Sequence, residues 1–290
     1  IQRIRGQLFA LVDRDIYRTN PMAYVPAINL DAYIVRDYAP AFARAGAIIK
    51  LCHGLAPYLE QARANLKLPM PRSWIDTALL QTTGLIEFAE TDVRKELAKI
   101  ELRLANQAEI DPALTACKSA LATHVAWLEQ QQPQGTNAYA LGEAKFMRML
   151  AETEGVETQL GTLAAIGAED LVRNTAALEE AARAIDPTRP VAELVRELAN
   201  DRPAHHEVLA LARDQSETLR TFVVENKIAT IPSDAVAVVR ESPAYRRWNT
   251  ASLDAPGPFE TKPLPSIYYI SPPDPKWPIE QQRGYIPPRA

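Results

Sequence analysis

Proline is the residue whose distribution most constrains how this chain can fold. Of its 23 prolines, 11 fall before Pro232 and 12 fall from Pro232 to Pro288. Each proline removes a backbone donor and clashes with the preceding helical turn, so dense prolines exclude long helices. The sequence therefore predicts a helical scaffold region over residues 1–231. Residues 232–290 are expected to form a proline-rich, extended segment.

The first region has the apolar spacing of amphipathic helices, with apolar residues recurring every three or four positions. Asp111 followed by Pro112 predicts the start of one such helix, with the aspartate as N-cap and the proline in the first turn. No fixed-period repeat is visible, so we expect a mainly α fold built as an irregular antiparallel helical assembly. The apolar stripe of the helix after Pro112 consists of Leu114, Cys117, Leu121, Val125 and Leu128.

One segment of the second region has the composition of a β-strand. Residues 264–271 combine β-branched and aromatic side chains and lie between Pro263 and Pro272. Prolines at both flanks confine a strand to the edge of a sheet. We therefore expect a single edge strand that contains Ile267, Tyr268 and Tyr269. Because a lone strand leaves its backbone groups unpaired, its partner strands are expected outside this sequence.

Composition narrows the classes of function. Apolar residues make up 47% of the 290 residues, charged residues 23%, and the formal net charge is −4. A charge this small argues against a nucleic-acid partner. No apolar stretch approaches the roughly 20 residues of a membrane span. The sequence begins at Ile1 and not at a methionine, so the natural N-terminus is expected to be missing, and a periplasmic, secreted or cytoplasmic location stays open.

The histidines do not form a metal-binding pattern. His205 and His206 are adjacent, and on a helix neighbouring side chains point roughly 100° apart. A zinc-binding helix carries its histidines four residues apart, and the positions four residues on are Leu209 and Ala210. His124 follows Cys117 by two helical turns, but a structural zinc site needs four ligands. We predict no metal ligand and no catalytic residue within this chain.

The two cysteines are expected to be buried free thiols, because Cys52 and Cys117 both lie among apolar neighbours of predicted helices. A single disulfide between them stays open as an alternative. No nucleophile elbow and no phosphate-binding loop occurs in the sequence.

An ordered set of short motifs resembles a bacterial family known as domain of unknown function 885. The set keeps a similar order and approximate spacing over nearly the whole chain. Its members are Asn20-Pro21 followed by Tyr24, Leu141-Gly142, residues 227–232 (Lys-Ile-Ala-Thr-Ile-Pro), Pro243 and Tyr268-Tyr269.

That resemblance implies a zinc-dependent peptidase of the gluzincin type, with a helical body similar to the carboxypeptidase Taq group. It also implies a zinc-binding His-Glu-x-x-Pro-Gly-His helix soon after the aromatic strand, and a glutamate ligand from a later helix. Neither occurs before Ala290, so the zinc ligands are expected outside this chain. Ile267, Tyr268 and Tyr269 would correspond to the strand that binds the substrate backbone.

Two hypotheses follow. In the first, the chain is the N-terminal helical half of a zinc metallopeptidase that cleaves peptides near a terminus, and its partners are the peptide substrate and the C-terminal half of the same protein. In the second, it is a non-catalytic helical scaffold whose proline-rich tail binds a partner protein. The tail segments at 272–275 and 287–288 could form polyproline II.

Overall fold

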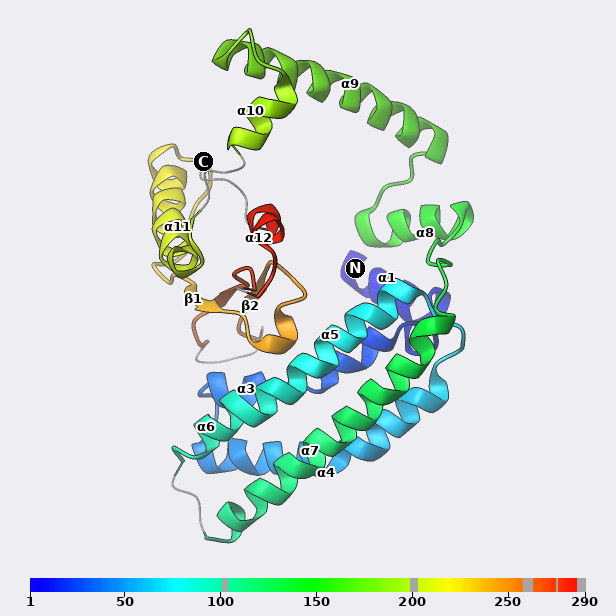
Figure 1. Ribbon diagram of the computed structural model, residues 1–290, viewed down its shortest axis with the longest axis vertical. Helices are drawn as coiled ribbons and strands as arrows, with labels where there is room; N and C mark the ends of the chain where they lie inside the picture. Colours follow the sequence, from blue (N-terminus) through cyan, green and yellow to red (C-terminus); the bar gives the residue numbers. More distant parts are fainter. Residues whose placement is uncertain (101–103, 199–202, 258–262, 275, 286–290) are drawn as a thin grey trace. The chain divides into compact units, whose positions relative to one another are not determined.

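A computed structural model describes the chain except for residues 101–103, 199–202, 258–262, 275 and 286–290 (Figure 1). It confirms the predicted mainly α fold. The described residues divide into two compact, interleaved units. The bundle unit comprises Ile1–Leu141, Ser242–Asn249 and Asp254–Ser266. The sheet unit comprises Gly142–Glu241, Thr250–Leu253 and Ile267–Ala290.

The bundle unit is built on three long helices, α4, α5 and α7, with shorter helical segments before and after them. Figure 1 shows these three helices side by side, and α7 packs against both others. The elements are α1 (Gln2–Leu8), the π-helix η1 (Phe9–Asp13), α2 (Ile16–Thr19), the 3₁₀-helix η2 (Pro21–Ala27), α3 (Asp31–Val35), α4 (Ala41–Asn65), α5 (Arg72–Phe88), the π-helix η3 (Ala89–Val93), α6 (Arg94–Leu97), α7 (Leu104–Gln131), and the 3₁₀-helices η4 (Gln132–Gln134) and η6 (Ala244–Arg246).

The core of the bundle unit follows from the apolar spacing of these helices. Side chains three or four residues apart lie on one helix face, and burying one leucine or isoleucine contributes about 1.5–3 kcal/mol. The larger of two clusters surrounds Cys52 and Cys117, and the smaller surrounds Met70 and Leu128. Four members of the predicted stripe on α7 are buried, namely Leu114, Cys117, Leu121 and Leu128.

The predicted start of α7 at Asp111 and Pro112 is wrong. The helix begins at Leu104 and runs through Pro112. A proline inside a helix costs about 3 kcal/mol, which packing of the preceding turns can offset. Ile110 packs against the larger core cluster, so tertiary contact supports the helix on the N-terminal side of the proline.

The sheet unit combines helices with a small sheet. Its helix α8 begins after Gly142, whose φ of +75° is strained for any other residue. This backbone conformation accounts for the glycine of the Leu141-Gly142 motif. The elements are α8 (Glu143–Glu154), α9 (Leu160–Ile185), α10 (Val191–Leu198), the 3₁₀-helix η5 (His205–Glu207), α11 (Val208–Glu225), β1 (Val238–Glu241), β2 (Ala251–Asp254), β3 (Ile267–Ile270) and α12 (Ile279–Tyr285).

The prediction of a single edge strand is wrong. The strand order is β1-β3-β2, so the aromatic strand β3 is central. It pairs in parallel with β1, from Val238 opposite Ile267 to Glu241 opposite Ile270. The flanking prolines did not confine β3 to an edge, because they lie outside its four residues. Its partner strands are also part of this chain, contrary to expectation, because the short runs that form them lack a strong strand pattern.

The predicted boundary at residues 231 and 232 follows proline content, whereas the compact units follow spatial contacts, so that boundary stays a prediction. In the second region the described helices are short: η6 has three residues and α12 has seven. Within the described residues, no helix combines the length and the apolarity that crossing a membrane requires.

Candidate functional site

The sheet holds the residues that the sequence singled out, and their side chains alternate between its two faces. Ile267 and Tyr269 are buried on one face. Tyr268 is half-buried on the other, where it packs against a small cluster formed by Val208, Val239 and Ile270. Of the three predicted substrate-binding residues, Tyr268 alone therefore keeps part of its side chain accessible.

The backbone of β3 is engaged along both sides, because β1 and β2 flank it. A peptide that adds to a sheet needs an edge with unpaired main-chain groups. Within the four residues of β3, no such edge is open. Any strand addition to this sheet must therefore occur at the outer side of β1 or β2.

β1 is in contact with α11. The first turns of α11 pack on the sheet through Val208, and Arg213 donates a hydrogen bond from Nη2 to the main-chain oxygen of Val239 at 3.4 Å. This contact takes up a carbonyl group of β1. Its length of 3.4 Å exceeds the usual range for an N–H···O hydrogen bond, so the interaction is weak.

β2 carries an apolar side chain that the rest of the structure leaves exposed. Leu253 is 63% exposed, although leucine in a strand usually packs against a neighbour. The start of the strand is joined to the end of β3 by a hydrogen bond from the amide of Ser271 to the oxygen of Thr250 at 2.9 Å. β2 is thus an outer strand of the sheet with one exposed apolar side chain, Leu253.

In the bundle unit, Asp254 is held by a buried arginine. Arg36 donates from Nε to Oδ2 of Asp254 at 3.0 Å, and from Nη2 to its main-chain oxygen at 2.9 Å. The Nη1 atom of Arg36 is buried without a hydrogen-bond partner among the described residues. The sequence offered no signal for this pair, because its members lie in loops and strand ends far apart along the chain.

A second buried charge lies nearby in the same unit. Asp31 is buried, and its Oδ2 lies 3.6 Å from Nη2 of Arg246. Arg246 also donates from Nε to the Tyr245 hydroxyl at 3.1 Å. Burial and the charge of Asp31 raise the pKa of Tyr245, so this phenol stays protonated. The cluster of Asp31, Tyr245 and Arg246 is charge-paired, which suits a structural role.

His124 is a buried histidine whose pKa is strongly lowered. It is buried on α7 and stacks on Trp127 with ring centroids 5.8 Å apart. Burial and the positive charge of Arg63 lower its pKa to about 4. Its Nδ1 atom has no hydrogen-bond partner within the described part of the chain, and the same holds for Oε1 of the buried Gln81 on α5. His124 is thus a neutral residue of the core.

Both cysteines are buried free thiols, as expected. A hydrogen bond with Cys117 and burial raise the pKa of Cys52. Cys117 therefore faces Cys52 and not His124. His205 and His206 lie exposed in η5. Among the residues that the structure describes, no group of three or more histidine, cysteine or acidic side chains could hold a metal ion.

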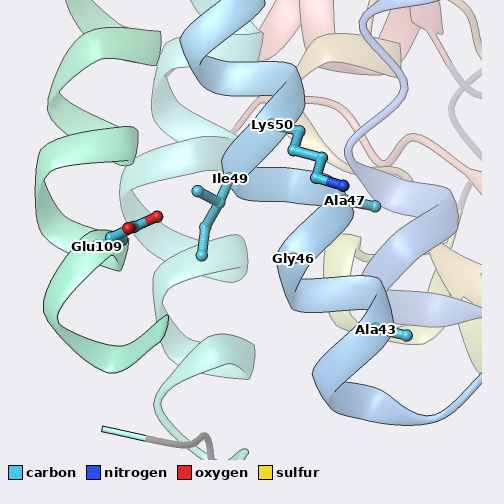
Figure 2. A pocket seen from close by; sticks show the side chains of 6 residues that line it. All are labelled: Ala43, Gly46, Ala47, Ile49, Lys50 and Glu109. Carbon is cyan, nitrogen blue, oxygen red and sulfur yellow. The ribbon is translucent and has the colours of Figure 1, made fainter. Parts of the chain in front are cut away.

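A groove of about 450 Å³ lies in the bundle unit between the first turns of α4 and α7. Figure 2 shows Lys50 on α4 and Glu109 on α7, separated by Ile49, while Ala43, Gly46 and Ala47 leave the α4 side shallow. A ligand site typically has several polar groups that converge on one point. Here the two charged side chains come from different helices with an apolar residue between them. The groove therefore lacks the converging polar groups that bind a specific ligand.

Comparison with known proteins gives the chain a family but no activity. A solved structure described as "a putative lipoprotein of unknown function from Shewanella oneidensis" matches with a TM-score of 0.63 and 21% sequence identity. The match covers 96% of this chain and 52% of that chain, so this chain spans about half the length of that relative. At this identity the likeness shows the fold alone. No curated protein matches.

The family model for a bacterial protein of unknown function, DUF885, matches residues 2–285. That range includes the bundle unit, the sheet and α12. The ordered motifs from Asn20 to Tyr269 thus all lie within the matched residues, which make up nearly the whole chain. This chain belongs to the DUF885 family.

Proposed function

We propose that this chain is the helical half of a zinc-dependent peptidase that hydrolyses peptides near a terminus. The zinc ion and the residues that bind it would belong to a further part of the protein. The proposal is supported by the resemblance of members of this family to gluzincin peptidases. The observation that carries it is the place of β2, an outer strand with the exposed Leu253, beside the central strand that contains Tyr268 and Tyr269.

In this proposal the peptide backbone pairs with the outer edge of β2. Strand addition of this kind gains affinity from main-chain hydrogen bonds and selectivity from the side chains next to them. Leu253 would contact an apolar side chain of the substrate. Ile267 and Tyr269 would stabilise the sheet through their packing on its buried face. Tyr268 would form part of the opposite face, where its side chain is partly accessible.

β2 is preferred to β1 because it presents the more exposed apolar side chain: Leu253 is 63% exposed and Val238 is 39% exposed. Arg213 already binds the oxygen of Val239 on β1, and α11 packs on that strand. Arg36 likewise binds the main-chain oxygen of Asp254 at the end of β2, so these hydrogen bonds do not distinguish the two outer strands. At β2, the exposed side chain of Leu253 gains apolar burial when a strand is added.

The test uses the continuous protein encoded by this gene, including whatever follows residue 290. Replacing Leu253 with lysine should raise the KM for short peptides severalfold and leave kcat nearly unchanged, because the change removes binding and not chemistry. The matched control is Val238→Lys on β1, which should leave KM unchanged. An unchanged KM in Leu253→Lys would exclude the β2 edge from the substrate site.

The alternative is a non-catalytic helical scaffold, and the observation that favours it is the long exposed apolar face of α9 in the sheet unit. Metal analysis of the purified protein separates the two functions. One zinc per chain, with a His-Glu-x-x-type helix encoded after residue 290, would support the peptidase. A metal-free protein without that helix would favour the scaffold.

A further inference from the structure

α9 exposes almost all of its surface although one side of it is apolar. Of its 26 residues, Ala182 alone is buried. Figure 1 shows α9 and α10 as a helical hairpin, and α10 supplies one buried side chain, Leu194. An isolated helix is marginal in water, and most helices are stabilised by packing of their apolar side. The apolar side of α9 thus lacks most of the packing that such a helix normally has.

Apolar and small residues recur along one side of this helix, with Asn174 between Leu171 and Leu178 on the same side. At roughly 100° per residue they fall on one side, over a length of about 39 Å. Leu171 and Leu178 lie two turns apart on the stripe and are 68% and 50% exposed. The acidic and basic side chains of α9 lie mainly outside it. The α9 stripe consists of Leu160, Leu163, Ala164, Gly167, Leu171, Leu178, Ala181, Ala182 and Ile185.

Gly167 is the glycine that lies on the stripe. Glycine disfavours a helix interior, and none of the described atoms lies within 4 Å of the place where its Cβ would be. Among the described residues of the sheet unit, no packing contact requires a glycine there. Together with the neighbouring alanines, it makes a shallow path in which a second helix can approach the backbone of α9.

We propose that the α9 stripe is the docking surface for the other half of the family-length protein. This inference rests on the proposed function, in which that half carries the zinc site. The related structure from Shewanella oneidensis has nearly half of its chain outside the shared region, since the match covers 52% of it. A segment in the same polypeptide binds at a high effective concentration, so a stripe of modest area is sufficient.

An apolar surface of this length is also unusual on a free monomer. Large exposed apolar patches mark interaction sites, and the polar rim expected of such a site is present. Glu169 and Arg173 lie on the opposite side of α9, where they remain in solvent. The stripe therefore has the pattern of a helix that is covered on one side and hydrated on the other.

The experiment compares two double variants of the continuous protein encoded by this gene. The first, Leu171→Asp with Leu178→Asp, places charges on the stripe. The matched control, Ile166→Asp with Val172→Asp, makes the same kind of change at residues that are 55% and 71% exposed on the other sides of α9. Cleavage by a non-specific protease under native conditions is measured for both, and also in the 290-residue chain alone.

The stripe variant should be cleaved roughly tenfold faster than the wild type in the continuous protein, because a charge is buried without a partner. The control should stay within about twofold in the same protein, since exposed substitutions have small effects. Both variants should stay within about twofold in the 290-residue chain, where both sets of residues are exposed.

Equal cleavage of the two variants in the continuous protein would overturn the proposal. So would a dimer of the 290-residue chain that the stripe variant dissociates in sedimentation, since a second copy would then be the occupant. Zinc content of the wild-type protein is measured in parallel. A metal-free protein whose stripe variant is still cleaved faster would refute the peptidase and leave the docking surface intact.

Discussion

Gly84 on α5 lies directly against the backbone of Tyr245. A Cβ at Gly84 would be 2.6 Å from both the Cα and the nitrogen of Tyr245, which is closer than real Cβ contacts. One turn further along α5, Phe88 contacts the Tyr245 ring with centroids 5.3 Å apart. Within the bundle unit, this contact fixes the returning segment 242–249 on the long helices.

Replacing Gly84 with alanine should therefore destabilise the protein. Alanine favours the helix by about 1 kcal/mol, but overpacking against rigid backbone costs about 1–3 kcal/mol, so a net loss is expected. The control is Gly46→Ala on α4, where a Cβ meets nothing within 4 Å and a small gain is expected. Urea unfolding measures both, and a gain in Gly84→Ala would contradict the close contact.

His124 should make the stability of the bundle unit depend on pH. Its pKa is lowered from 6.5 to about 4 in the folded chain, first by burial and then by Arg63. The unfolded chain therefore binds a proton that the folded chain does not, between these two values. Stability should be highest above pH 6.5, fall as the pH drops, and lose about 3 kcal/mol from this group by pH 4.

The contribution of His124 is isolated by comparing the wild type with His124→Phe. The phenylalanine variant keeps an aromatic ring against Trp127 but cannot be protonated. The difference in unfolding free energy between the two proteins should change between pH 6.5 and pH 4 in the stated direction. A difference that stays constant over this range would show that His124 is not buried as a neutral side chain.

Loss of the Arg36–Asp254 pair should be costly. The side chain of Arg36 is 10% exposed, and breaking a largely buried pair costs about 3–5 kcal/mol because one charge loses its partner. Arg36→Met should therefore lower the free energy of unfolding by an amount near the lower end of this range. The exposed pair Arg183–Glu179 is the control, and Arg183→Met should cost less than about 1 kcal/mol.

The two thiols should resist modification until the bundle unit opens. Cys52 and Cys117 are both buried, so a disulfide reagent cannot reach either sulfur while the helices stay packed. An aromatic disulfide reagent should therefore label neither cysteine in native buffer and both in denaturant. Rapid labelling of the native protein would show that α4 and α7 separate readily.

The local pattern of the sequence determined the helices of this protein. Apolar residues at intervals of three or four identify the buried side of α7. The burial of Cys52 and Cys117 was likewise expected from their apolar neighbours. These features depend on residues a few positions apart, so they can be read without knowledge of the tertiary structure.

Tertiary structure decided where the segments lie relative to their distant neighbours. β3 is central because β1 and β2, two short strands with weak patterns of their own, pair on its two sides. The pairs of Gly84 with Tyr245 and of Arg36 with Asp254 likewise join residues that are far apart along the chain. Such contacts arise from close packing and from the pairing of buried charges, neither of which has a short-range signature in the sequence.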